Sequence, residues 1–171
     1  MYKSLKIIIF LLVIDTYSYS QIYHTNSQHM IGIFYSQSSH RNICGKSYQY
    51  FINSNISIKI SLCFENLLFN NSNNQSLLIK PEFLFTHYSD GKYLFFNVKS
   101  GFLSGLETLN ATSNNQQRKY FCFGTLIGET LEFYISPKTK FEFEVEERAI
   151  KTRLKLTFIP YFTFGTYFKF N

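Results

Sequence analysis

Side chains of alternating character occupy the segment Lys140–Glu147, which reads KFEFEVEE. Phe141, Phe143 and Val145 fall on one side of an extended chain, and three glutamates fall on the other. Because the side chains of a strand alternate between two faces, this spacing predicts a β-strand and excludes a helical stripe. The segment therefore needs an apolar environment on one face and a polar environment on the other.

The same alternation recurs along the chain, and no long window has helical spacing. Two of the segments, near residues 30 and 50, alternate less cleanly than the others. Eight strands are predicted in all: Met30–Ser36, Tyr48–Asn53, Ile56–Glu65, Leu77–Thr86, Leu94–Glu107, Phe121–Ile135, Lys140–Glu147 and Phe158–Phe170.

The connections between these strands alternate between long and tight. Long polar connections are predicted at Ser36–Lys46, Asn66–Gln75 and Asn110–Lys119, and a shorter one follows Glu147. Tight turns are predicted between them, one of which contains the Asp90-Gly91 pair that favours hairpins. An up-and-down barrel would place all long loops at one end, which is typical of outer-membrane barrels. The predicted fold is all-β, an eight-stranded antiparallel up-and-down barrel of the outer-membrane type.

Alternation alone does not say which face is inside. A secreted lipocalin-like barrel would turn the apolar face inward, whereas a membrane barrel turns it toward lipid. Charged residues are only 16% of the chain and aromatic residues are 19%, and the polar face carries small residues with charges of both signs, which suits the narrow interior of eight strands. We therefore expect a packed ionic core rather than a pore, formed by Lys59, Lys80, Glu82, Lys99, Glu107, Glu132, Glu142 and Glu144.

Tyrosines near the predicted strand ends fit the aromatic girdles that membrane barrels place at the lipid headgroups. The residues concerned are Tyr48, Tyr93, Tyr134 and Tyr167.

The first twenty residues have the pattern of a secretory signal peptide. Lys3 and Lys6 precede the apolar run Ile7–Ile14, and small Ser18 and Ser20 occupy the two positions that a signal peptidase reads ahead of a predicted cleavage before Gln21. A transmembrane anchor is the alternative, but the run has less than half the length of a spanning helix. We expect a signal peptide at 1–20, a single barrel domain at 21–171, and a location in the bacterial outer membrane.

Three stretches of the chain resemble the TraO family of conjugative-transposon proteins. They are Phe95–Asn110, which carries a Gly-x-Glu-Thr element, Gly128–Ala149, which carries a Leu-Glu-x-Tyr strand end, and Phe162–Asn171, which carries a Gly-x-x-x-basic-Phe-Asn ending. The resemblance implies an outer-membrane envelope component of a conjugative DNA-transfer apparatus, with a structural or assembly role. It implies contacts with outer-membrane lipid and with other proteins of the apparatus, made through the three long loops.

No residue pattern predicts catalysis, a cofactor or a metal site. The four histidines lack ligand spacing, the three cysteines form no zinc motif, and the row Glu142, Glu144 and Glu146 is better explained by neutralising lysines than by a bound cation. The bases are too scattered for direct nucleic-acid binding. The alternatives to a conjugation protein are a small porin-like or adhesin barrel and a secreted lipocalin-like binding protein.

Overall fold

The computed structural model describes residues 26–39, 41–67, 74–90, 93–110, 117–151 and 156–170. The predicted signal peptide at 1–20 lies outside this part of the chain. None of the described residues forms a helix long and apolar enough to cross a membrane.

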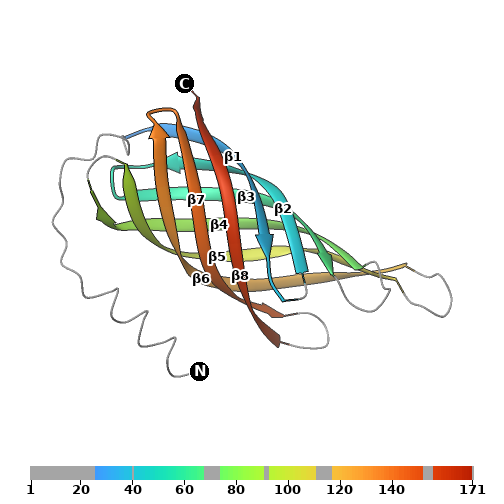
Figure 1. Ribbon diagram of the computed structural model, residues 1–171. Helices are drawn as coiled ribbons and strands as arrows, with labels where there is room; N and C mark the ends of the chain where they lie inside the picture. The colour runs from blue at the N-terminus through green and yellow to red at the C-terminus, as the bar shows by residue number, and fades with distance from the viewer. Residues whose placement is uncertain are drawn as a thin grey trace.

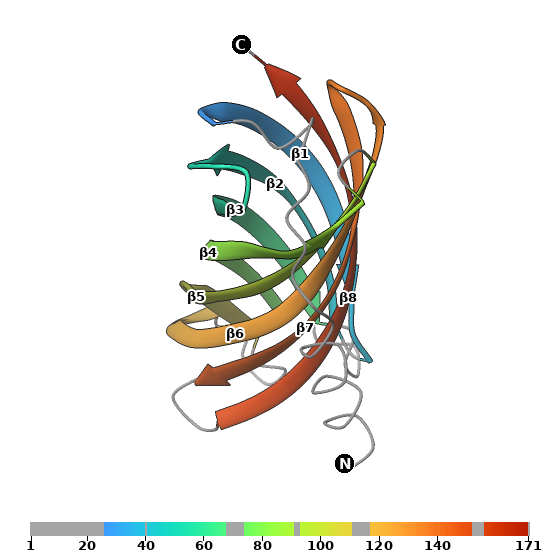
Figure 2. The same ribbon diagram turned by 90° about the vertical axis from the view of Figure 1, so that its left-hand side faces the viewer.

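Eight strands close into one antiparallel barrel in which each strand pairs with its sequence neighbours and β8 pairs with β1 (Figures 1 and 2). The predicted fold class is therefore confirmed. The strands are β1 Gln28–Gln37, β2 Arg41–Phe51, β3 Ile56–Leu67, β4 Asn74–Ser89, β5 Leu94–Asn110, β6 Gln117–Ser136, β7 Thr139–Lys151 and β8 Leu156–Phe170.

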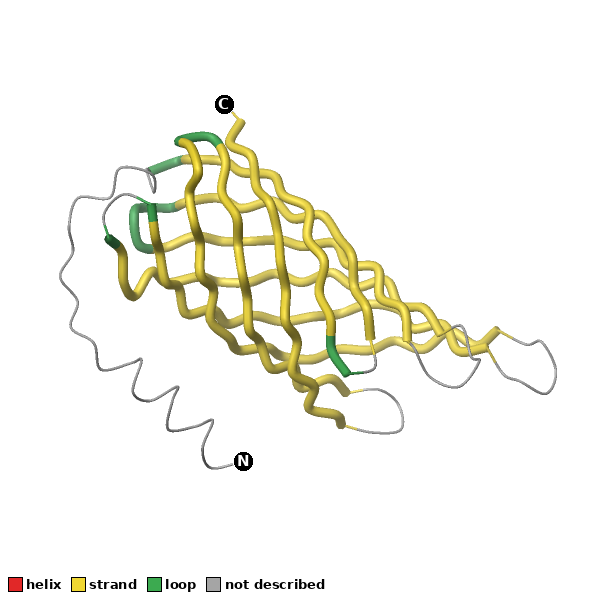
Figure 3. The backbone as a smooth tube through the Cα atoms, in the orientation of Figure 1, coloured by secondary structure: helices red, strands yellow, loops and turns green. Residues whose placement is uncertain are grey.

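Three short turns gather at one end of the barrel, together with the end of β8 (Figure 3). Two of them are fixed by a side-chain oxygen that accepts backbone N–H groups ahead of it. Asn53 Oδ1 accepts bonds of 2.8 Å from the N–H groups of Asn55 and Ile56, and Asp90 Oδ1 accepts bonds of 2.8 Å from Tyr93 and Leu94. These bonds satisfy backbone donors where the strands stop pairing, which defines a turn end opposite the loop end.

The predicted long connection at Ser36–Lys46 is wrong. β1 continues to Gln37 and β2 already begins at Arg41. The alternation of β2 was hidden because apolar Ile43 faces inward while charged Lys46 faces outward, which reverses the usual parity. The other two predicted loops lie largely outside the described residues.

The apolar face of the sheet points away from the barrel axis on the strands other than β2. Phe102 is 67% exposed, Phe162 64% and Ile33 60%, whereas Glu142 and Glu144 are buried. This orientation is that of a barrel surrounded by lipid, and it is the reverse of a lipocalin-like barrel with an apolar cavity. The secreted lipocalin-like alternative is therefore wrong.

Aromatic side chains also enter the interior, where glycines on neighbouring strands make room for them. Tyr134 and Tyr167 are fully buried inside the barrel, so their predicted place in an outer aromatic girdle is wrong, whereas Tyr48 and Tyr93 are exposed. A Cβ added at Gly32 would lie 2.4 Å from Cδ1 of the Tyr167 ring. The ring therefore occupies the space that a side chain at position 32 would need.

We expect Gly32→Ala to lower the free energy of unfolding by about 1–3 kcal/mol, because the Tyr167 ring must leave its rotamer. Urea unfolding in detergent micelles measures the change. In a Tyr167→Leu background the same substitution should cost much less, since the obstructing ring is gone. An equal cost in both backgrounds would show that Tyr167 is not the cause.

Candidate functional site: a charged network inside the barrel

All eight residues that the sequence assigns to a polar core lie in the barrel interior and are buried. Seven of them take part in one network of ion pairs, and Glu107 lies nearer the loop end of β5. The seven are Lys59, Lys80, Glu82, Lys99, Glu132, Glu142 and Glu144.

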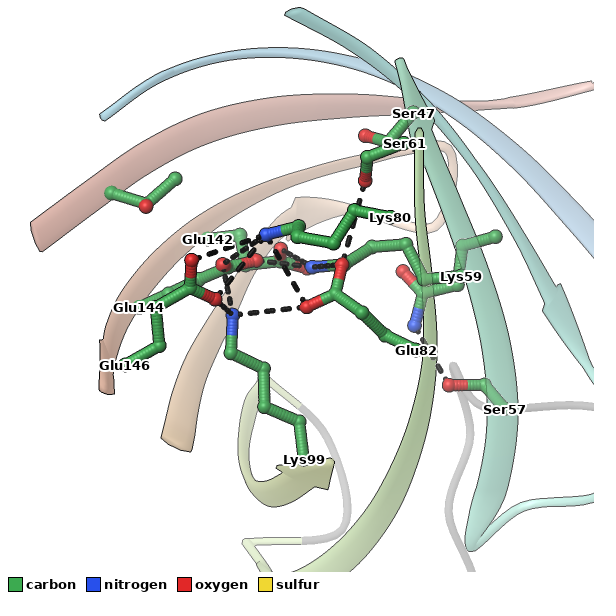
Figure 4. A network of polar contacts seen from close by, with 12 residues as sticks. Ser47, Ser57, Lys59, Ser61, Lys80, Glu82, Lys99, Glu142, Glu144 and Glu146 are labelled. Atoms are coloured by element: carbon green, nitrogen blue, oxygen red, sulfur yellow. Dashed lines mark hydrogen bonds and ion pairs between the residues drawn. The ribbon is translucent and has the colours of Figure 1, made fainter. Parts of the chain in front are cut away.

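Glu144 on β7 holds the middle of the network (Figure 4). Its two carboxylate oxygens accept separate hydrogen bonds from Lys59 on β3 and Lys99 on β5, and Lys80 on β4 lies 3.9 Å away. Three strands on the far wall thus supply cations to one carboxylate. Alternation on four separate strands aims these side chains at the same point of the interior.

Toward the loop end the network continues through Glu146. This carboxylate lies 3.2 Å from the Lys80 ammonium, contacts Lys99, and accepts a 2.5 Å hydrogen bond from Nε of Arg148. Glu82 lies 3.2 Å from Lys99 and 3.4 Å from Lys80 on the opposite side. Every ammonium in this part of the barrel therefore touches more than one carboxylate.

Toward the turn end the network is completed by Lys140. Its ammonium lies 2.6 Å from Glu132, 2.9 Å from Glu142 and 2.7 Å from the amide oxygen of Gln49. Glu142 also lies 2.7 Å from Lys59, which links this group to the middle of the network. Gln49 in turn donates a 2.9 Å hydrogen bond to Ser57.

The network is electrically balanced. Five cations (Lys59, Lys80, Lys99, Lys140 and Arg148) face five carboxylates (Glu82, Glu132, Glu142, Glu144 and Glu146). Oxygens of three of these glutamates lie within 4.8 Å of one another, which is close enough for a cation. The lysine ammonium groups already supply the positive charge there, so the arrangement fits structural neutralisation rather than metal binding.

Apolar layers close the interior on both sides of the network. On the turn side Phe95 packs edge-on against Tyr134 at 5.4 Å, next to Met30, Phe51 and Tyr167. On the loop side a second cluster fills the barrel, made of Phe34, Ile43, Cys63, Leu78, Leu103, Cys122, Ile150 and Tyr161. A charged layer between two packed apolar layers leaves the interior filled by side chains, as eight strands favour.

A smaller polar group lies beyond the loop-side layer. The Tyr161 hydroxyl donates a 2.7 Å hydrogen bond to Glu65, and Arg41 lies 3.1 Å from the other oxygen of that carboxylate. Arg148 stacks on the Tyr161 ring, with its guanidinium carbon 3.9 Å from the ring centre. Glu107 lies toward the same end of the barrel, in register with Ser76 on β4 and Tyr120 on β6.

Sequence reasoning left Lys140, Glu146, Arg148, Gln49 and Arg41 out of the predicted core. The first three have the parity of Glu142 and Glu144 on β7: Lys140 and Glu146 lie inside the predicted strand and Arg148 follows one residue after it, so applying that parity through Arg148 would have included all three. Gln49 and Arg41 lie on β2, where the alternation is weak. Their positions follow from strand register, which the sequence does not display.

The fold, the outward apolar face and the filled ionic interior together define an eight-stranded barrel of the outer-membrane type. Solved structures of that class are similar to the chain. The N-terminal barrel domain of Pseudomonas aeruginosa OprF has a TM-score of 0.68 at 16% identity and covers 85% of this chain and 98% of that domain. Neisserial surface protein A has a TM-score of 0.62 at 12% identity, covering 84% and 95%.

The attachment invasion locus protein Ail of Yersinia pestis, in complex with the heparin analogue sucrose octasulfate, has a TM-score of 0.60 at 15% identity and covers 85% of this chain and all of that one. Identities this low establish a shared fold. No protein-family model and no curated protein matches the chain by sequence.

Proposed function

We propose that the chain is a non-catalytic, non-conducting outer-membrane component of a conjugative DNA-transfer apparatus, similar to the TraO family. Its task is structural: the barrel anchors in the outer membrane and offers its loops and outer wall to other proteins of the apparatus. The observation that carries the proposal is the place of the TraO-like stretches in the fold. They lie in β5, the second half of β6, most of β7 and the later part of β8, which are four neighbouring strands of the barrel.

The filled interior supports a structural role over a transport role. The ten charged groups of the network pair with one another, and clusters of buried apolar side chains lie on both sides of it. Ions and small solutes would have to break buried ion pairs to pass, which is costly. A porin-like function is therefore disfavoured, and a DNA strand has no path through a single barrel.

An adhesin is the second candidate. It is favoured by the similarity in fold to Ail, whose name describes attachment and invasion. An adhesin and an assembly component both use a sealed barrel as an anchor, so a cellular experiment must separate them.

We expect deletion of the gene to abolish or strongly lower transfer of the mobile element from donor cells. Filter mating measures the transfer frequency, and expression of the intact chain in the same donors should restore it.

Washed membrane fractions should contain a band whose gel migration shifts on heating, as closed barrels show. Planar bilayers containing the purified protein should show no conductance steps.

Unchanged transfer combined with weaker attachment of the deletion strain to host cells or sulfated polysaccharide would reject the conjugation role in favour of an adhesin. Regular conductance steps would reject the sealed interior. A chain found only in the periplasm or medium would reject membrane anchoring.

A further inference from the structure

Three charged side chains break the apolar pattern of the outward face. Glu129 on β6, Glu147 on β7 and Lys46 on β2 have the outward parity of their strands, and each lies in the middle third of its strand. None of the three forms an ion pair within the described part of the chain, although the interior pairs ten charges completely. The mid-belt of a membrane barrel is where outward charges are least favourable.

Each of these charges is enclosed by apolar neighbours on the adjoining strands. Lys46 lies in register with Ile33 on β1 and Leu62 on β3, which are 60% and 51% exposed. Glu129 lies in register with Val98 on β5 and Val145 on β7. The charges are thus not at the edge of the apolar belt, where water and headgroups would solvate them.

The two carboxylates form a pair of their own. Glu147 is in register with Ile127, two residues from Glu129, so the carboxylates are diagonal neighbours across β6 and β7 on the outward face. Lys46 lies on the opposite wall, because three strands separate β2 from β6 in either direction around the closed barrel. Opposite charges on opposite walls cannot meet within one barrel, but they can meet between two.

The outer surface of the barrel is recessed near Glu129. An outer groove of about 330 Å³ lies where Pro81, Ser100 and Thr125 present small side chains between bulkier neighbours such as Phe83 and Phe102. Small residues on a lipid-facing surface allow another polypeptide to approach closely. The groove adjoins the acidic pair, since Ser100 is in register with Ile127, the residue beside which both carboxylates lie.

We propose that this wall of β5, β6 and β7 binds a second copy of the same chain in the membrane, with Lys46 of one barrel between Glu129 and Glu147 of the next. The contact joins two different walls, so it repeats from barrel to barrel in a row or ring rather than closing as a twofold dimer. A second copy brings a cation to the two carboxylates and two carboxylates to the lysine, which the hydrocarbon of the membrane does not provide.

Native Cys44 offers a built-in probe, because it is exposed on the outward face two residues from Lys46, while Cys63 and Cys122 are buried. Thr125→Cys places a second thiol in the groove. A short bismaleimide applied to outer membranes should then give covalent dimers and larger species. Matched Phe168→Cys, exposed near the turn end of β8 in register with Thr139 and therefore distant along β7 from the acidic pair, should remain monomeric, as should the unmodified chain.

Charge reversal tests the pairing itself. In the Thr125→Cys chain, Glu129→Lys should lower the cross-linked fraction severalfold, and adding Lys46→Glu should restore it. All variants should keep the heat-dependent gel shift, which shows that they fold. Absence of cross-links in Thr125→Cys membranes, equal yields from the Phe168→Cys control, or no recovery in the charge-swapped chain would overturn the proposal.

Discussion

Glu144→Leu is expected to lower the free energy of unfolding by about 3–5 kcal/mol, because it leaves buried ammonium groups without their shared carboxylate. Lys59 and Lys99 each donate to a different oxygen of Glu144, and both lysines are buried. Leucine fills much of the vacated volume, so the loss reports on charge rather than on a cavity. Urea unfolding in lipid vesicles, followed by tyrosine fluorescence and gel shift, measures it.

Two companion variants isolate the electrostatic cause. Phe143→Leu changes the adjacent outward residue of β7 and should cost far less, since its neighbours there are lipid and Phe164. Lys99→Met combined with Glu144→Leu removes one charge of each sign and should recover part of the stability lost in the single variant. A double variant as unstable as the sum of the two single variants would argue against a balanced network.

Which face of the sheet points inward could be predicted from the small residues on the polar face as well as from the alternation. β3 is predicted at Ile56–Glu65 and observed at Ile56–Leu67, since five large apolar side chains, from Ile56 to Phe64, follow one another at every second position. β2 was predicted to begin at Tyr48 instead of Arg41, because apolar Ile43 faces inward and charged Lys46 faces outward, which is the reverse of the pattern on the other strands. Strand prediction from local alternation fails where a charged side chain faces the membrane. Lys46 is such a side chain, and it is one of the three charges from which the contact with a second copy is inferred.

The composition of the charged core was partly predictable, but its pairing was not. Alternation places Glu142 and Lys59 on inward faces, yet they are 83 residues apart and meet only because the closed barrel brings β3 and β7 across from each other. Lys140 reaches Gln49 of β2 for the same reason. Such pairs depend on strand tilt and register, which are properties of the closed sheet rather than of any segment.

Phe164→Arg is expected to destabilise the inserted barrel by about 2–4 kcal/mol, and Phe170→Arg by only about 0–1 kcal/mol, because an outward arginine costs most at the bilayer midplane. The two phenylalanines are matched: both face outward on β8, at 44% and 41% exposure, and both have aromatic neighbours. Phe164 lies mid-strand beside Tyr35 and Phe143, whereas Phe170 is the last residue of β8 at the turn end.

Reversible urea unfolding from lipid vesicles measures both free energies, and changing the lipid separates the cost of placing arginine in hydrocarbon from the cost of losing the phenylalanine contacts. Repeating both substitutions in vesicles of shorter acyl chains should narrow the difference between them, because a thinner bilayer moves position 164 nearer to the headgroups. Equal costs at the two positions, or a difference that does not change with bilayer thickness, would mean that the Phe-rich face is not in contact with hydrocarbon. The outward aromatic and aliphatic side chains would then have to be covered by protein around the whole circumference of the barrel. A barrel surrounded by lipid needs no such cover.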